Sequence, residues 1–342
     1  MKIVDVFNHI FPKRCFAKFQ SVAPRLEDMG KRIRNIPMLT DLDVRFRTMD
    51  EFGDYRQILS LASPPIETYA GPDVSPELAR MANDEMAELV SRYPDRFPGF
   101  LASLPMNNPE VAVAEMHRAI TGLKARGVQI YSNAAGKSLD GAEYAPLFEG
   151  MAAADLPLCL HPARGAGPAD YSGEEKSKYE IWWTFGWPYE TSVAMARLVF
   201  SGLFDRLPDI KIITHHMGAM IPYFEGRVGY GWDQIGTRSS QEDYAALRKS
   251  MKMRPVDYFH KFYADTALFG SLAATRCGLE FFGADQVLFA SDSPFEPQPG
   301  LYIRETIRVV QALEISSLER EKICYRNAAR LLKLPEGESL AA

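Results

Sequence analysis

The sequence predicts a single α/β domain over residues 1–342, folded as a (β/α)8 barrel of the TIM type. About eight short runs rich in Val, Ile and Leu have the length and composition of buried parallel strands. Amphipathic, helix-like stretches separate these runs from one end of the chain to the other. No G-x-G-x-x-G motif or P-loop follows any run, which disfavours the competing doubly wound open sheet.

The candidate strands and helices follow one another in regular order. The helical pattern is clearest at 75–97 and at 108–127, where Asn108 is expected to cap the helix and Gly127 to end it. The expected strands are 2–7, 56–62, 97–105, 127–132, 156–162, 210–216, 262–267 and 287–292.

Two segments interrupt this alternation. Residues 10–46 form a long insertion after the first strand, and the Gly-, Pro- and aromatic-rich segment 163–190 follows the fifth. Long loops after barrel strands lie at the catalytic mouth, so both are expected to form the substrate pocket.

Composition excludes several classes of function. The net charge of −5 gives no electrostatic argument for binding nucleic acid or an anionic membrane, and no apolar run approaches the length of a membrane span. The four cysteines are widely separated, and the N-terminus leads directly into a strand without an apolar signal region. We therefore expect a cytoplasmic protein with a small-molecule partner.

Polar residues stand at the ends of four separate strand-like runs. They are His9, His161, the pair His215–His216, and Asp292. The carboxyl ends of barrel strands meet at one mouth, and imidazole and carboxylate groups bind divalent metals or move protons. The sequence thus predicts a metal-dependent active site.

Each of these residues also has a simpler interpretation. His9 and His161 could be hydrogen-bonded barrel histidines, and Asp292, followed by Ser-Pro, could cap the next helix. Asp265 is a weaker candidate of the same kind. Because His215 and His216 are adjacent, only one of them is expected to face the interior of a regular strand.

The motifs together resemble the amidohydrolase superfamily, in the branch of aminocarboxymuconate-semialdehyde decarboxylase and γ-resorcylate decarboxylase. The resemblance spans nearly the whole chain, and its H-x-G-x-x-x-P and S/T-D-x-P-F elements are fairly specific together. The motifs are D-V-F-N-H-I-F-P at 5–12, D-V-R-F-R-T-M-D at 43–50, G-V-Q-I-Y-S-N at 127–133, L-H-P at 160–162, W-x-x-G-W-P-Y-E-T-S at 183–192, H-M-G-A-M-I-P-Y-F-E-G-R at 216–227, F-Y-A-D at 262–265, S-D-S-P-F at 291–295 and N-A-A-R-L-L at 327–332.

The resemblance implies roles for the polar strand ends. His9, His161 and Asp292 correspond to metal ligands of the family. His216 corresponds to its catalytic histidine, because only His216 has glycine at +2 and proline at +6. Asp292 would share in catalysis, and His215 would be a packing residue or a residue that supports the ligands from behind.

The resemblance also implies substrate contacts and an assembly. Arg45 or Arg47 would anchor a substrate carboxylate, and Trp183 would stack on a planar substrate. Arg227 matches a structural or subunit-interface position, and a homodimer is expected.

Phe7 departs from the family pattern. It stands where the family has the first metal-ligating histidine or glutamate, and a phenylalanine cannot coordinate a metal. Three ligands and a water still make a catalytic zinc site, so activity is retained in this interpretation. Phe7 is expected to share a face with His9 and to line the cavity.

The most concrete prediction is a metal-dependent, non-oxidative decarboxylase of a small unsaturated or aromatic carboxylic acid, with zinc, manganese or cobalt as the ion and zinc preferred. Alternatives are hydrolysis of a lactone, amide or imine, or hydration of a conjugated acid, at the same site. A barrel that binds its ligand without turnover is the third possibility.

Overall fold

A computed structural model describes residues 1–24, 28–240 and 242–334, and its strands form a ring of parallel β-structure. One group of strands runs β1–β2–β3 and the other runs β4–β5–β8–β9–β10–β11, all paired in parallel. The strands are β1 (Ile3–Ile10), β2 (Tyr55–Leu61), β3 (Gly99–Phe100), β4 (Ala102–Ser103), β5 (Val128–Tyr131), β8 (Leu158–His161), β9 (Ile212–Thr214), β10 (Tyr263–Asp265) and β11 (Val287–Leu288).

Backbone hydrogen bonds close this ring at both joins. Leu101 N donates to Leu59 O between β3 and β4, so these two short strands are one interrupted barrel strand. At the other join, Val6 N donates to Phe289 O and Asp292 N donates to Phe7 O, which links the last strand to the first. The predicted TIM barrel is confirmed.

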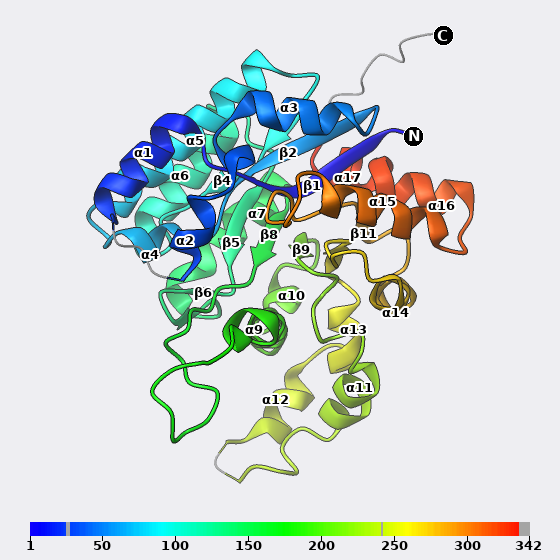
Figure 1. Cartoon of the computed structure of the whole chain (residues 1–342). Helices are drawn as coiled ribbons and strands as arrows, with labels where there is room; N and C mark the ends of the chain where they lie inside the picture. The colour runs from blue at the N-terminus through cyan, green and yellow to red at the C-terminus, as the bar shows by residue number, and fades with distance from the viewer. Residues whose placement is uncertain (25–27, 241, 335–342) are drawn as a thin grey trace.

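Helices surround the strands (Figure 1). A small antiparallel hairpin, β6 (Asn133–Ala134) and β7 (Lys137–Ser138), lies outside the barrel sheet. The helices are α1 (Lys13–Val22), α2 (Met29–Ile33), η1 (Pro37–Leu39), α3 (Leu42–Asp50), α4 (Ile66–Tyr69), α5 (Ser75–Arg92), α6 (Pro109–Thr121), η2 (Ala142–Tyr144), α7 (Ala145–Ala154), α8 (Ile181–Thr184), α9 (Gly186–Phe200), α10 (Leu203–Arg206), α11 (Glu225–Asp233), α12 (Tyr244–Ser250), α13 (Pro255–Phe259), α14 (Leu272–Phe282), α15 (Leu301–Ala312), α16 (Ser317–Glu321), η3 (Lys322–Arg326) and α17 (Asn327–Leu331).

Helix ends differ from the sequence expectation. The second expected helix ends at Thr121 rather than at Gly127, and Asn108 occupies its N-cap position without a side-chain cap. Asn108 Nδ2 donates instead to Pro72 O, because a tertiary partner competes with the local cap. Among the described residues, no helix is long and apolar enough to cross a bilayer.

Candidate metal centre and active site

Four buried side chains from four parts of the barrel form one cluster. They are His9, His161, His215 and Asp292, and each offers one nitrogen or oxygen atom lying within 4.8 Å of the others. His9 lies on β1 and His161 ends β8, whereas His215 and Asp292 follow the ends of β9 and β11. The parallel barrel thus gathers residues that are up to 283 positions apart in the chain.

His9 is fixed from several sides. Its Nε2 lies 3.0 Å from Asp292 Oδ1, and its Nδ1 lies 3.3 Å from Ser60 Oγ. Arg45 donates to its backbone carbonyl. Burial lowers the pKa of His9, and the adjacent Asp292 only partly opposes this effect. The neutral imidazole, which is the form that binds metals, is therefore favoured.

His161 presents one ring nitrogen to the cluster. Its Nδ1 lies 2.7 Å from Pro162 O, and a carbonyl can only accept, so Nδ1 carries the proton and Nε2 keeps its lone pair. Ser63 Oγ lies 3.3 Å from Nε2. Burial, together with the nearby rings of His215 and His9, holds the pKa of His161 well below its usual value.

His215 is oriented by a second carboxylate. Its Nδ1 lies 2.5 Å from Asp265 Oδ2. Its Nε2 is buried and lies 3.3 Å from Asp292 Oδ1, but the two groups are not oriented to form a hydrogen bond. Burial lowers the pKa of His215, but Asp265 and then Asp292 outweigh burial and raise it to about 10, so an ion that binds Nε2 has to displace a proton from it.

His216 also reaches the site, which corrects the expectation that only one of the two histidines faces it. His216 Nε2 lies 3.7 Å from Asp292 Oδ2, at the partly exposed edge of the cluster. The strand ends at Thr214, and His216, Met217, Gly218 and Ala219 all have positive φ, between 54° and 71°. This left-handed turn, rather than strand alternation, directs the second imidazole inward.

Asp292 contacts three of the four histidines. Burial would raise its pKa, but the adjacent imidazoles of His215, His216 and His9 hold it well below the usual value. Its φ of 61° is left-handed, and the next helix begins only at Leu301. The interpretation of Asp292 as a helix cap is therefore wrong.

Phe7 is fully buried against the histidines. Its ring centroid lies 4.2 Å from that of His215 in a stacked arrangement, and 5.4 Å and 5.7 Å from those of His9 and His161. It is not among the residues that line the cavity above the cluster, so the expectation that Phe7 faces the cavity is wrong. The imidazoles cover it.

A cavity of about 560 Å³ opens above the cluster. His161 and Asp292 form part of its lining, and α2 and the segment around α8 contribute most of the rest. Its aromatic residues are Trp182, Trp183, Trp187, Phe269, Phe295 and Tyr302. Flat apolar walls of this kind suit a planar ligand.

The structure does not bring Arg45 and Arg47 to this cavity, contrary to expectation. Arg45 is fully buried, and its guanidinium donates to Met38 O, Asn8 Oδ1, Gln57 Oε1 and His9 O. Arg47 is exposed on α3 and does not line the cavity. A helix places residues two positions apart on different faces, and neither face opens to the cavity.

Basic residues that the sequence reasoning missed do line the cavity. They are Lys31 and Arg32 on α2, and Arg32 donates to Phe295 O. Their only signal in the sequence was their position within the 10–46 insertion, because short loops and helices carry no periodicity that shows which side chains point inward.

The donor set fits a divalent ion. Three imidazoles and one carboxylate converge in a buried site, and His215 Nε2 has no hydrogen-bond partner among the described residues. Buried polar atoms without partners are costly, and Nε2 would be satisfied by coordination. The cluster is a divalent metal site.

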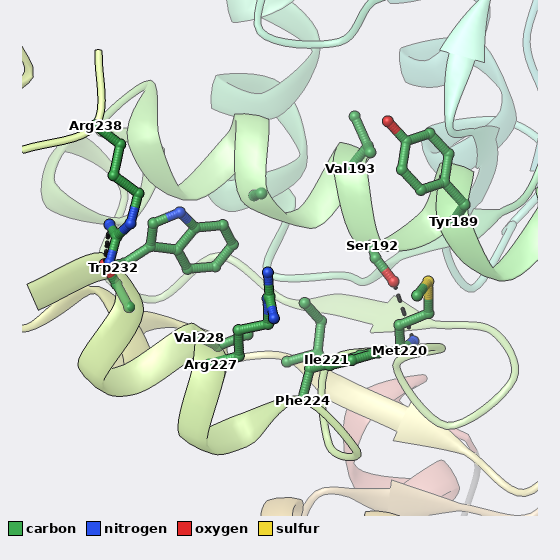
Figure 2. Close-up of a pocket in the computed structure, with 12 residues that line it drawn as sticks. Tyr189, Ser192, Val193, Met220, Ile221, Phe224, Arg227, Val228, Trp232 and Arg238 are labelled. Atoms are coloured by element: carbon green, nitrogen blue, oxygen red, sulfur yellow. Dashed lines mark hydrogen bonds between the residues drawn. The ribbon is translucent and has the colours of Figure 1, made fainter. Parts of the chain in front are cut away.

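A second pocket lies elsewhere on the molecule. Figure 2 shows an apolar groove between α9 and α11, with Tyr189 and Val193 on one side and Arg227 and Trp232 on the other. It shares no lining residue with the cavity above the metal cluster. It is therefore a separate surface feature.

Comparisons with known proteins agree with this site. Residues 39–334 match the family described as Amidohydrolase. A γ-resorcylate decarboxylase from a Polaromonas strain is 37% identical over 300 residues, which cover 85% of this chain and 87% of the relative. A 2-amino-3-carboxymuconate-6-semialdehyde decarboxylase from Dictyostelium discoideum is 30% identical over 315 residues, which cover 91% and 82%.

Solved structures of decarboxylases are similar to this chain over nearly its whole length. A 2,6-dihydroxybenzoate decarboxylase complexed with 2,6-dihydroxybenzoate has a TM-score of 0.79 at 28% identity, covering 98% of this chain and 99% of that one. A dihydroxybenzoic acid decarboxylase from Polaromonas, with bound manganese and the inhibitor 2-nitroresorcinol, has a TM-score of 0.77 at 30% identity, covering 100% and 99%.

Fold and site together define a metal-dependent barrel enzyme. The chain belongs to the amidohydrolase family, in the branch of the γ-resorcylate and aminocarboxymuconate-semialdehyde decarboxylases. Its activity is metal-dependent, non-oxidative decarboxylation.

Proposed function

We propose that the substrate is a hydroxylated aromatic carboxylic acid. The observation that carries this proposal is the aromatic-walled cavity directly above the metal cluster. The relatives named γ-resorcylate decarboxylase and the structure holding 2,6-dihydroxybenzoate support it. A divalent ion would supply a Lewis acid that binds substrate oxygens and stabilises negative charge.

His9, His161 and Asp292 hold the ion in this proposal, and Phe7 replaces the first ligand of the family. Zinc is the proposed metal, because imidazole-rich sites with one carboxylate suit it. The manganese bound by the Polaromonas relative makes manganese the alternative. Elemental analysis of protein purified without chelators or added metal distinguishes the two.

His216 is the proposed general acid and base. Its Nε2 lies at the open edge of the cluster, 3.7 Å from Asp292 Oδ2, where it can exchange a proton with a group in the cavity. When the bond between the ring carbon and the carboxylate carbon breaks, CO₂ leaves and the electron pair of that bond stays on the ring carbon. The ring carbon then takes a proton from His216. Asp292 holds the imidazole in place during the transfer.

Residues of the two insertions position the substrate. Trp183 lines the cavity and is proposed to stack on the aromatic ring. Arg32, rather than Arg45 or Arg47, is proposed to meet a substrate anion, because among these three arginines only Arg32 lines the cavity. The insertions 10–46 and 163–190 thus form the pocket of one domain spanning residues 1–342.

We also propose a homodimer that works in the cytoplasm. Tyr189 and Arg227 line the groove in Figure 2, and Tyr189 is exposed. Tyr223 and Tyr230, which are next in sequence to the lining residues Phe224 and Gly231, are exposed as well. Apolar surface of this kind favours an interface. All four cysteines are free, which suits a reducing compartment. Light scattering should give twice the mass of the 38.4-kDa chain.

Measurement of CO₂ release tests the proposed function. Metal-loaded protein should release CO₂ from 2,6-dihydroxybenzoate or a related hydroxybenzoate, and the His216→Ala variant should lose kcat by orders of magnitude, roughly 10² to 10⁴, while keeping its metal. Titration with base detects the alternative, because hydrolysis of a lactone or amide releases a new carboxylate and no CO₂. No CO₂ from a panel of aromatic acids would overturn the proposal.

A further inference from the structure

We propose that His215 is the fourth protein ligand of the metal, in place of the first-strand residue that Phe7 has replaced. The inference rests on the proposed metal dependence of the enzyme and adds a ligand to it. It assigns His215 direct contact with the metal, whereas the sequence predicted a packing or supporting residue. His216, its neighbour, is left free for proton transfer.

The position of His215 Nε2 is the first argument. It belongs to the group of four donor atoms within 4.8 Å of one another, together with atoms of His9, His161 and Asp292. It is buried, and in the part of the chain that the structure describes it has no hydrogen-bond partner, although Asp292 Oδ1 lies 3.3 Å away. An unpartnered nitrogen that faces three other donors is placed as a metal ligand would be.

Asp265 supplies the second argument. Its Oδ2 lies 2.5 Å from His215 Nδ1, and its Oδ1 accepts from the backbone N–H groups of His216 and Ala267. A carboxylate on the far nitrogen of an imidazole fixes the ring and makes the near nitrogen a better ligand. Asp265 is fully buried, so the contact is shielded from water.

Phe7 supplies the third argument. Its ring stacks on His215 with centroids 4.2 Å apart and an angle of 22° between the planes. It fills the space beside the imidazole and fixes the orientation of that ring, so that Nε2 points toward the other donor atoms. The chain thus has an apolar support on β1 and a nitrogen donor after β9, which together keep the site at four donors.

Metal affinity and cobalt spectra test this inference without relying on activity. Affinity for Zn²⁺ is measured by competition with a chromophoric chelator, and Co²⁺ absorption reports the number of ligands. His215→Ala should weaken Zn²⁺ binding at least about a hundredfold and shift the Co²⁺ bands. Asp265→Asn should weaken it by about ten- to a hundredfold. His216→Ala should weaken Zn²⁺ binding less than His215→Ala does, since it removes only a neighbour of the ligand Asp292 and no ligand.

A double variant keeps the test falsifiable if His215→Ala loosens the fold. Phe7→His in the His215→Ala background should restore part of the lost affinity, because it returns a nitrogen to the position that Phe7 occupies. Circular dichroism of the metal-free proteins checks that each variant is folded. Unchanged Zn²⁺ affinity and Co²⁺ spectrum in folded His215→Ala would overturn the inference, as would an equal loss in His216→Ala.

The two proposals fail in different ways. If wild-type protein loaded with metal releases CO₂ but His215→Ala keeps its metal affinity, only the ligand assignment falls. If wild-type protein binds metal through His215 but releases no CO₂ from any aromatic acid, the proposed substrate falls and the ligand assignment stands.

Discussion

Single residues beneath the metal cluster determine how rigidly it is held. Asp5 lies on β1 and is fully buried, and its carboxylate accepts hydrogen bonds from Tyr55, Phe7 and Ser291. Burial outweighs these hydrogen bonds and raises the pKa of Asp5 to about 6. The charged form of Asp5 is therefore disfavoured by folding.

The contribution of Asp5 to the stability of the metal-free protein should consequently fall as pH rises from about 4 to about 6. In this range folded Asp5 still holds a proton that the unfolded chain has released, so raising the pH favours unfolding. Two pKa units correspond to about 3 kcal/mol as an upper value. Urea unfolding of Asp5→Asn should lack this slope, whereas Asp73→Asn, at an exposed position, should keep it. Equal slopes in both variants would contradict the assignment.

Arg45 is the second residue whose effect can be separated from catalysis. Its guanidinium satisfies four acceptors around β1 and β2, including the carbonyl of His9. Burial lowers its pKa to about 10. Its function is structural in this arrangement, since none of its donors faces the cavity.

Arg45→Met should therefore destabilise the protein by several kcal/mol, on the order of 3–5, because it leaves buried acceptors without partners. Arg47→Met, two positions away on the exposed face of α3, should change stability by less than about 0.5 kcal/mol. Thermal and urea unfolding measure both. A stable Arg45→Met protein with a raised KM would instead support the substrate contact expected from the sequence.

At the scale of elements, the segment between β9 and α11 decides which side chains enter the site. Its left-handed residues 216–219 pack against α14, where Gly278 lies under Met217. An added Cβ at Gly278 would lie 1.9 Å from Met217 Cγ, so the turn and the helix are in close contact. The helix thus supports the strained turn.

Gly278→Ala should therefore push the turn away from α14. Overpacking of this kind costs typically about 1–3 kcal/mol, and turnover should fall because His216 moves with Met217. Gly226→Ala in α11 is the matched control, since an added Cβ meets no atom within 4 Å there. It should be neutral or stabilising by up to about 1 kcal/mol. The free energy of unfolding and kcat, measured for both, distinguish strain at the turn from a general intolerance of alanine.

At the scale of the whole molecule, the metal cluster joins strands from both ends of the chain. His9 lies on the first strand and Asp292 follows the last one. His9 N donates to Ser293 O where these two strands meet. In Figure 1 the N-terminal strand β1 lies beside the C-terminal helices that cover the last strand. An ion bound by these residues would hold the barrel closed.

Removal of the metal should accordingly destabilise the entire barrel. An ion that binds only the folded state at a thousand times its Kd stabilises that state by about 4 kcal/mol. Calorimetry of chelator-treated and zinc-saturated protein should show a single transition in each case, at a higher Tm with metal. A metal-independent Tm would show that the cluster is equally stable without an ion, and would contradict coordination by these buried residues.

The sequence by itself determined the barrel and most of the polar strand ends. The apolar runs and their alternation with helices predict the strands, because a strand buried on both faces is continuously apolar. His9, His161 and Asp292 were found because a parallel barrel brings the carboxyl ends of its strands to one mouth. Both arguments depend on patterns that are local in the chain.

Only the tertiary structure decided how His215 and His216 share the site. Strand alternation predicts one inward imidazole, but β9 ends at Thr214. Beyond it, His215 and His216 both donate hydrogen bonds to Asp265, which lies fifty positions further along the chain. In the same way, Arg45 is turned away from the cavity by partners on β1 and β2, and Arg32 reaches it through α2. Contacts between distant segments set these orientations, so no local periodicity could have predicted them.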